Sequence, residues 1–177
     1  MIIERVGPGD VCLIKREPIK DERGFFARAF CKNELEQAGL CGDIKQVNMS
    51  YNIEKGTLRG LHSQVGEDAE DKIVVCVAGE IFDVCVDVRT DSKTFGKWYG
   101  ANLSAWNGHA LYVPKGFAHG YITLTEAVSV LYFVTQFYRH GAEKGYRYDD
   151  PALGIKWPIA PPYIVSDKDR AWPLIKL

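Results

Sequence analysis

The chain has 177 residues, with 22 Lys and Arg against 23 Asp and Glu, which gives a formal net charge of −1. This balance, without a long basic run, argues against DNA or RNA binding through a broad basic surface. A small cationic pocket for a phosphate is still allowed. The length predicts a single domain over 1–177, with a core of about 20–140 and a packed tail over 141–177.

The chain is expected to lie in the cytoplasm, free of membranes. Its first ten residues carry charges at Glu4, Arg5 and Asp10 and lack the apolar run of a secretory signal. The most apolar segment, 73–88, is interrupted by acidic residues and is too polar to span a membrane. The five cysteines are scattered without a CxxC pair, which indicates a reducing compartment.

Strand-like runs dominate the chain. They are rich in Val, Ile, Tyr and Phe, and turn residues separate them at short intervals. In chain order, strands are expected at 12–15, 24–30, 45–51, 57–64, 72–78, 80–89, 97–104, 109–114, 118–124 and 127–138.

Helix and turn signals are few. Asn33 is the expected cap of one short helix, Glu36 stands at the capping-box position and Gly39 ends it. A hairpin turn is expected at 78–80, and further turns are expected at 114–116 and 125–126. After 138 the repeated prolines exclude long regular elements and predict a tail with short helical turns.

Many short antiparallel strands joined by tight turns are typical of a sandwich or a barrel. Several strands, KIVVCVA at 72–78 among them, are apolar at both odd and even positions, so on both of their faces. This favours double-sheet packing over a sheet with one wet face. The sequence therefore predicts an all-β jelly-roll barrel with a few short helices, and such a barrel can hold a small ligand in its mouth.

A few polar groups interrupt these apolar strands or stand in the tail. Taken singly, each has an ordinary explanation, such as a core tyrosine or a solvated lysine. Together they supply a base, cations, a phenol and an orienting carboxylate. Buried titratable groups are costly unless paired, so we expect them to share one cavity. They are Arg59, His62, Lys72, His119, Tyr132 and Asp169.

The stretch LRGLHSQ, 58–64, poses a geometric problem. Strict alternation puts His62 with Leu58 and Gly60 on one face, and Arg59 with Leu61 on the other. If both polar groups serve one pocket, the strand must be irregular, and Gly60 is the natural place for a bulge. Otherwise Arg59 works at the rim.

A metal-dependent reaction is the main competing chemistry for such a barrel. It needs clustered ligands, such as His-x-His with a nearby Glu. The sequence has His62-Ser63-Gln64 instead, and His109 and His119 stand ten residues apart without a third ligand at an obvious spacing. We expect no metal.

Six segments, in the same order along the chain, resemble the dTDP-4-dehydrorhamnose 3,5-epimerases, which are cupin-type jelly rolls acting on nucleotide-linked 4-keto-6-deoxy sugars. RGLH, the DVR-x-x-S-x-TFG-x-W pattern and P-x-GFAHG are specific in combination. The matching segments are 21–30, 58–64, 72–107, 111–124, 149–158 and 166–169.

The resemblance assigns catalytic roles to four residues. His62 is the implied base, and Asp169 is the partner that orients it. Tyr132 is the implied general acid on the opposite face of the sugar, and Lys72 is the group that stabilises the enolate oxygen.

The resemblance also implies a substrate-binding set. Two arginines hold the pyrophosphate, a Q-x-N pair serves the nucleotide, a histidine lines the sugar pocket, and aromatic residues supply a ring for base stacking. These residues are Arg23, Phe26, Gln46, Asn48, Arg59, His119, Phe137 and Tyr138.

The chemistry explains these residue types. A proton next to a ketone is only weakly acidic, and its removal needs a positioned base and an oxyanion stabiliser in a dry site. Inversion then requires a separate acid on the other face. Because the substrate already carries a C4 ketone, no redox cofactor is needed, and the chain has no GxGxxG loop. We therefore expect no cofactor.

The chain departs from the family pattern around the predicted recognition residues. Ser63 replaces an aromatic, Phe133 replaces a lysine, Val47 stands inside the Q-x-N pair, and Arg28 stands where many members have a glutamate. The nucleobase, the number of carbons inverted and the final sugar therefore stay open. The alternatives are a 3-epimerase acting on a CDP-linked sugar, a binding module without catalysis, and a metal-dependent cupin.

The family implies a homodimer that exchanges strands between subunits. On this basis, residues 2–6 and 11–16 could pair across the interface. The implied pathway is deoxysugar biosynthesis for a surface polysaccharide, such as O-antigen, or for a glycosylated product.

Overall fold

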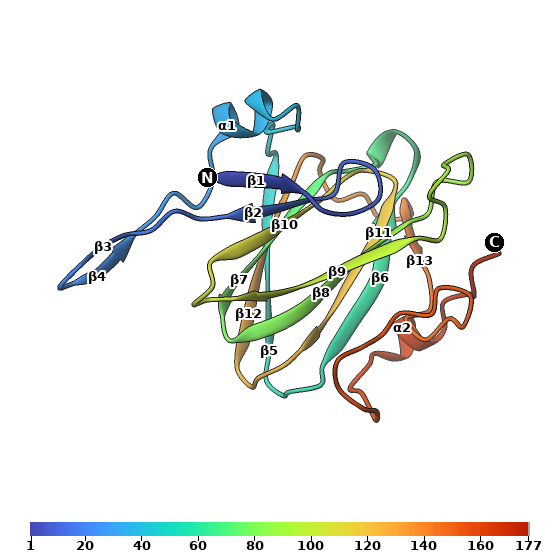
Figure 1. Cartoon of the computed structure of the whole chain (residues 1–177). Helices are drawn as coiled ribbons and strands as arrows, with labels where there is room; N and C mark the ends of the chain where they lie inside the picture. The colour runs from blue at the N-terminus through green and yellow to red at the C-terminus, as the bar shows by residue number, and fades with distance from the viewer. Residues whose placement is uncertain (177) are drawn as a thin grey trace.

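The computed structural model describes residues 1–176, which form two facing β-sheets with short helices at the periphery (Figure 1). The six-stranded sheet has the order β1-β2-β10-β7-β12-β5. Its strands are β1 (Ile2–Arg5), β2 (Cys12–Lys15), β5 (Gln46–Asn52), β7 (Lys72–Ala78), β10 (His109–Val113) and β12 (Val128–Val134).

The five-stranded sheet has the order β13-β6-β11-β8-β9. Its strands are β6 (Leu58–Gln64), β8 (Glu80–Asp87), β9 (Trp98–Ser104), β11 (Phe117–Thr123) and β13 (Glu143–Gly145). Pairing within both sheets is antiparallel throughout. The predicted all-β jelly-roll fold is confirmed.

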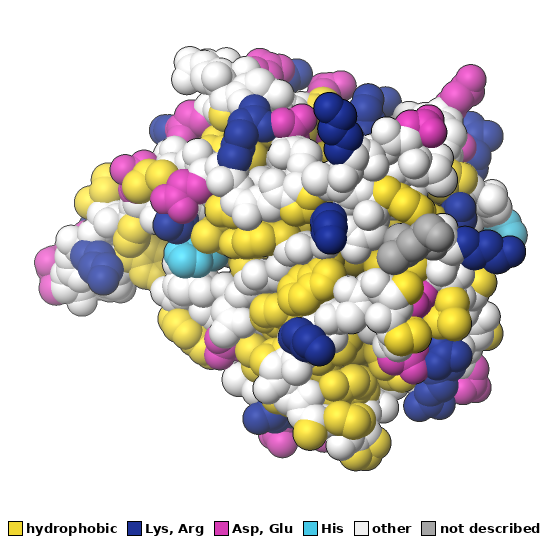
Figure 2. Space-filling view, turned by 45° about the vertical axis from the view of Figure 1, so that its right-hand side comes forward, with side chains coloured by type: hydrophobic (Ala, Val, Ile, Leu, Met, Phe, Trp, Pro, Cys, Tyr) yellow, Lys and Arg dark blue, Asp and Glu magenta, His cyan; other side chains and the backbone are white. Residues whose placement is uncertain are grey.

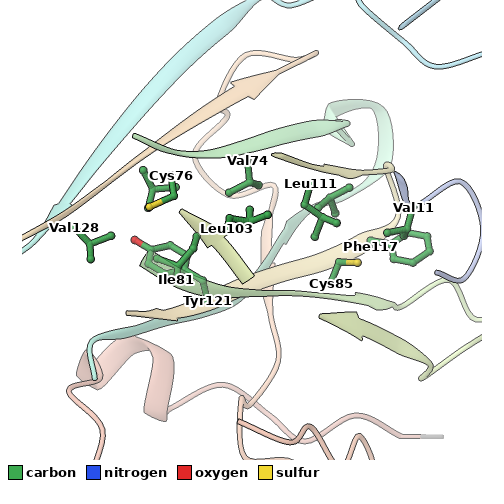
Figure 3. Close-up of a cluster of buried hydrophobic side chains, with 12 residues drawn as sticks. Val11, Val74, Cys76, Ile81, Cys85, Leu103, Leu111, Phe117, Tyr121 and Val128 are labelled. Carbon is green, nitrogen blue, oxygen red and sulfur yellow. The ribbon is translucent and has the colours of Figure 1, made fainter. Parts of the chain in front are cut away.

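The space between the sheets is filled by apolar side chains from both of them (Figure 3). On β7, Val74 and Cys76 point into this cluster, whereas Ile73 and Val75 point outward. The outward pair is covered by Leu35 of α1 (Lys32–Gln37) and its surroundings. Both faces of this strand are therefore buried over 73–76, which explains why consecutive residues there are apolar.

The five-stranded sheet is covered on its outer face by the chain after β13. Val84 and Val86 of β8 pack there against Tyr146, Leu153 and Ile175. This tail includes α2 (Asp167–Arg170), and Figure 1 shows it running beside β6 and β13. The tail was expected to be packed and irregular, and it is.

The expected hairpin turn at 78–80 is wrong. β7 belongs to the six-stranded sheet and β8 to the five-stranded sheet, so this turn carries the chain from one sheet to the other. The turns at 114–116 and 125–126 also cross between the sheets, since they connect β10 to β11 and β11 to β12. Gly79 has φ +73, and a Cβ there would lie 2.5 Å from Thr125 Oγ1.

The short helix begins earlier than its sequence signals indicate. Its N-cap is Cys31, with no side-chain hydrogen bond, so Asn33 is not the cap. Gly39, with φ +76, follows the C-cap and ends the helix as expected.

A two-stranded arm projects from the barrel (Figure 1). It consists of β3 (Ile19–Asp21) and β4 (Gly24–Phe26), and the expected strand over 24–30 stops at 26. Within the chain, β1 pairs with β2 and β2 pairs with β10, so residues 2–6 lie at the edge of the six-stranded sheet, and their pairing across an interface stays a prediction. Among residues 1–176, no helix has the length and apolar character needed to cross a membrane.

Candidate active site

A cavity of roughly 390 Å³ lies between the two sheets, bounded by strands of both sheets and by α2. It gathers all six polar residues that were expected to share one site. Four further side chains complete its wall, namely Ser50, Tyr121, Ser166 and Lys168.

An irregularity in β6 places both Arg59 and His62 in this cavity. Leu58 and Leu61 point the other way, into clusters covered by the tail. The register between β6 and β11 shifts at this point, and Gly60 has φ +125. A Cβ on Gly60 would lie 2.6 Å from the Gly120 Cα, so the two backbones touch. The irregular strand that a shared pocket requires is therefore present.

His62 and Asp169 form a hydrogen-bonded dyad. Nε2 of His62 lies 2.6 Å from Oδ1 of Asp169, and the Gly60 N–H donates to Oδ2 at 3.1 Å. Burial opposes ionisation of this carboxyl, but the hydrogen bonds from His62 and Gly60 outweigh it and keep the pKa of Asp169 below its usual value. The carboxylate only accepts hydrogen bonds, so Nε2 carries the hydrogen and the lone pair stands on Nδ1.

Asp169 lies in the tail and is held in position by the N-terminal cap of α2. Ser166 is the N-cap of α2, and its hydroxyl accepts the Asp169 N–H at 3.1 Å. Trp172, just after α2, packs edge-on against the His62 ring with centroids 6.4 Å apart. Gly145 makes room for it, because a Cβ there would lie 2.1 Å from Trp172 Cε2.

Tyr132 approaches the cavity from β12, on the other sheet. Its hydroxyl contacts Ser50 Oγ at 2.8 Å and the Tyr121 hydroxyl at 3.1 Å. Burial raises the pKa of Tyr132 above that of an ordinary phenol. The Tyr132 phenol therefore stays protonated at cellular pH. Lys72, at the start of β7, pairs with Glu70 at 3.1 Å and also lines the cavity.

A second buried histidine–carboxylate pair stands beside the dyad. Nε2 of His119 lies 2.7 Å from Oδ1 of Asp83, and both side chains are buried. Burial raises the pKa of the Asp83 carboxyl, and His119 opposes this shift. His119 is the register partner of His62, so the two imidazoles lie on adjacent strands.

An adjoining cavity of roughly 220 Å³ shares His62, Lys72 and Tyr132 with the first and is also lined by Asn48 and Tyr138. Gln46 connects these two residues. Its Nε2 donates to Asn48 Oδ1 at 2.8 Å, and its Oε1 accepts the Tyr138 N–H at 3.3 Å. The neighbouring Phe137 is exposed at the surface.

Two predicted binding residues stand apart from this site. Arg23 and Phe26 lie on the projecting arm, where Arg23 pairs with Asp21 and Phe26 is 75% exposed. The arm extends away from the barrel (Figure 1), so the chain does not bring these two residues to its own cavity, and their role in binding stays a prediction.

Sequence reasoning missed several residues of the site. The S-x-x-D spacing of Ser166 and Asp169 is a helix-start signal and could have identified the cap. Lys168, which pairs with Glu143, reads in the sequence as a solvated charge. Nothing local distinguishes Tyr121 or Asp83 from an ordinary core tyrosine or a strand carboxylate. Across residues 1–176, no group of three or more His, Cys, Asp and Glu side chains is placed to hold a metal ion.

Comparison with known proteins identifies the family. The model of the dTDP-4-dehydrorhamnose 3,5-epimerase family matches residues 8–176. The dTDP-4-dehydrorhamnose 3,5-epimerase of Salmonella typhimurium is 42% identical over 176 residues, covering 99% of this chain and 96% of the relative.

Solved structures agree with this match. The crystal structure of the Bacillus anthracis dTDP-4-dehydrorhamnose 3,5-epimerase with TDP and PPi bound has a TM-score of 0.91 and 43% identity, covering 94% of each chain. A 3′-monoepimerase from Streptomyces bikiniensis, in complex with dTDP-quinovose, has a TM-score of 0.90 and 30% identity, covering 97% of this chain and 86% of its own. The chain therefore belongs to the dTDP-4-dehydrorhamnose 3,5-epimerase family and is an epimerase, an isomerase by reaction class.

Proposed function

We propose that the chain inverts C3 and C5 of a dTDP-linked 4-keto-6-deoxyhexose in deoxysugar biosynthesis, without a cofactor. The observation that carries this proposal is the His62–Asp169 dyad, with 2.6 Å between Nε2 and Oδ1, on one sheet and the Tyr132 phenol on the other, both lining one cavity. A base and an acid on opposite walls are what inversion at a carbon requires.

The proposed reaction starts at His62. Its Nδ1 lone pair removes the hydrogen from the carbon next to the ketone, and the electrons of the broken C–H bond move to the ketone oxygen. Asp169 supports the resulting imidazolium, as carboxylates do in other His–Asp pairs. The Lys72 ammonium stabilises the enolate oxygen. Tyr132 then delivers its proton to the opposite face of the same carbon.

The substrate class follows from the groups around the cavities. Arg59 lines the main cavity and suits a diphosphate. Asn48 and Tyr138 line the adjoining cavity, and the exposed Phe137 ring next to them suits a stacked nucleobase. The TDP and PPi bound to one related structure and the dTDP-quinovose bound to the other support this interpretation.

Solvent deuterium exchange tests the proposed reaction. Purified protein is incubated in heavy water with dTDP- and, separately, CDP-linked 4-keto-6-deoxyglucose, and C3 and C5 are followed by NMR. We expect label at both carbons of the dTDP-sugar, with inverted configuration, because both carbons flank the ketone. Tight binding by calorimetry without any label uptake would instead identify a binding module.

A 3-epimerase is the second candidate, and the similarity to a 3′-monoepimerase with a TM-score of 0.90 favours it. The same NMR experiment separates the two candidates. Label and inversion confined to C3 identify the 3-epimerase, and faster turnover of the CDP-sugar identifies the other nucleotide specificity.

We further propose a homodimer in which the arm of one subunit completes the site of the other. Apolar side chains gather on the arm (Figure 2), where Ile19, Phe25 and Phe26 are exposed. The outward face of β5 and its continuation offer a matching apolar row of Val47, Met49, Tyr51 and Ile53, all at least half exposed. Such patches are typical of a protein interface, and dimerisation would bring Arg23 to a partner.

Mixed dimers test the shared site. Arg23→Ala and His62→Ala are each expected to be nearly inactive. Unfolding and refolding them together should restore about a quarter of the wild-type activity, since half of the dimers are mixed and each carries one intact site. No recovery, with mixed dimers shown by mass spectrometry, would contradict a site shared between subunits.

A cytoplasmic location is also proposed. It is supported by the cysteines at positions 12, 31, 41, 76 and 85, which are all unpaired in the structure.

A further inference from the structure

A polar network lies behind Tyr132, and the proposed reaction does not use it. Tyr121 and Asn52 are 1% and 2% exposed, although each carries groups that must be hydrogen-bonded. The Tyr121 hydroxyl lies 2.9 Å from Ser50 Oγ, which in turn lies 2.8 Å from the Tyr132 hydroxyl. Asn52 joins this group to Arg59, whose Nε donates to Asn52 Oδ1 at 2.7 Å.

The chemistry of its neighbours fixes the orientation of the Asn52 amide. Arg59 only donates hydrogen bonds, so it must face Oδ1. The backbone oxygen of Val128 only accepts, so it must face Nδ2, which lies 3.2 Å away. The second Nδ2 hydrogen is then directed to the Tyr121 hydroxyl at 3.1 Å. Figure 3 shows this hydroxyl at the end of the core cluster nearest Val128.

This orientation gives the whole network one direction. Tyr121 accepts from Asn52 and, at 3.1 Å, from the Tyr132 hydroxyl, and its own hydrogen goes to Ser50 at 2.9 Å, a shorter contact than the 3.3 Å to Asn52 Oδ1. Ser50 then donates to Tyr132 at 2.8 Å. The donors run in series from the guanidinium of Arg59 to the oxygen of Tyr132, and aligned hydrogen bonds of this kind polarise and strengthen one another.

We propose that Tyr121 is a positioning residue for Tyr132, because it links Ser50 and Asn52 into a chain of donors that ends on the Tyr132 oxygen. This inference rests on the proposed role of Tyr132 as the acid. When Tyr132 protonates the substrate carbon, its O–H bond breaks and the electron pair stays on the phenolate oxygen. The new C–H bond takes the electron pair of the enolate.

The network acts on that phenolate. Ser50 donates a hydrogen bond to it directly. Behind Ser50, the hydrogen bonds from Arg59, Asn52 and Tyr121 all donate in the direction of the phenolate. Such support is needed because burial raises the pKa of Tyr132 and makes a phenolate at this position costly. After product release, a proton from water restores Tyr132, and His62 returns its own proton to solvent.

Tyr121→Phe removes the linking hydroxyl and keeps the ring that packs in the core. We expect inversion at C3 to slow roughly ten- to hundredfold, the loss typical of a hydrogen bond to a charged group. Proton abstraction by His62, measured as deuterium uptake with retained configuration, should stay within about twofold because it does not need Tyr132. The KM should also stay within about twofold.

A matched control is Tyr99→Phe, which removes a phenol hydroxyl beside the same core cluster but outside the network. It should leave inversion unchanged. Thermal unfolding of both variants checks that they fold alike. If Tyr121→Phe slows uptake and inversion equally, its role is structural packing and the inference is overturned.

The double variant Tyr121→Phe/Tyr132→Phe separates this inference from the proposed function. In a Tyr132→Phe background, where inversion has already fallen, the second change should have no further effect on either readout. An additional loss of tenfold or more means that Tyr121 acts independently of Tyr132 and overturns the inference. If Tyr132→Phe alone inverts at the wild-type rate, Tyr132 is not the acid, and the proposed function itself is contradicted at this residue.

Discussion

Replacing His62 with alanine is expected to lower deuterium incorporation into the keto sugar by roughly 10²- to 10⁴-fold, the usual contribution of a positioned general base. In the proposed reaction Nδ1 of His62 meets the substrate, because Nε2 is held by Asp169 at 2.6 Å. The neighbouring His119 lines the same cavity, but its Nε2 is bound to a different carboxylate, Asp83. It is therefore not placed to take over the role of the dyad.

The matched control for this variant is His140→Ala, which removes an exposed histidine outside both cavities. NMR in heavy water reads the exchange at C3 and C5 separately. Exchange at the wild-type rate in His62→Ala would show that another group is the base. Equal losses in both variants would point to a general effect on the protein rather than to the dyad.

Asp169→Asn is expected to reduce epimerisation by roughly 10²- to 10⁴-fold, because the neutral amide no longer supports a protonated His62. The amide also fits its surroundings poorly. The Gly60 N–H donates to Oδ2 at 3.1 Å, and an amide NH₂ at that position would set donor against donor. Asp167→Asn is the control, since that carboxylate lies on the same helix and is fully exposed.

The Asp169 carboxylate also gives stability a specific pH dependence. Its pKa is lowered in the folded protein, so its contribution to stability is fully present above the unfolded pKa of about 4 and is lost as pH falls through the lower folded value. Chemical denaturation between pH 7 and pH 3 should therefore show a smaller acid-induced loss in Asp169→Asn than in the wild type. An identical slope would contradict the ionised dyad.

The strands of the barrel could be predicted from the sequence because apolar β-branched and aromatic residues mark each of them. Which sheet a strand joins could not. The residues at 78–80 favour a tight turn equally well whether the chain folds back on β7 or crosses to the other sheet. Both β7 and β8 bury apolar side chains on their two faces, so their side-chain pattern does not indicate which strands they pair with.

Prediction of the site succeeded where a strand breaks its own pattern. Arg59 and His62 cannot share a face in a regular strand, and the backbone contact between Gly60 and Gly120 resolves this conflict. Prediction failed where a functional residue is of a type that is also common in an apolar core. Tyr121 looks like any core tyrosine, and only its contact with Ser50 at 2.9 Å shows that its hydroxyl has a partner.

The position of Asp169 couples assembly of the molecule to its chemistry. This carboxylate follows every strand in chain order, and it meets His62 from a segment, 146–175, that covers the outer face of the five-stranded sheet. A chain that has formed both sheets but not yet docked this segment has a pocket with an unsupported imidazole. Removal or undocking of this segment is therefore expected to abolish turnover, because it takes the carboxylate away from the His62 ring.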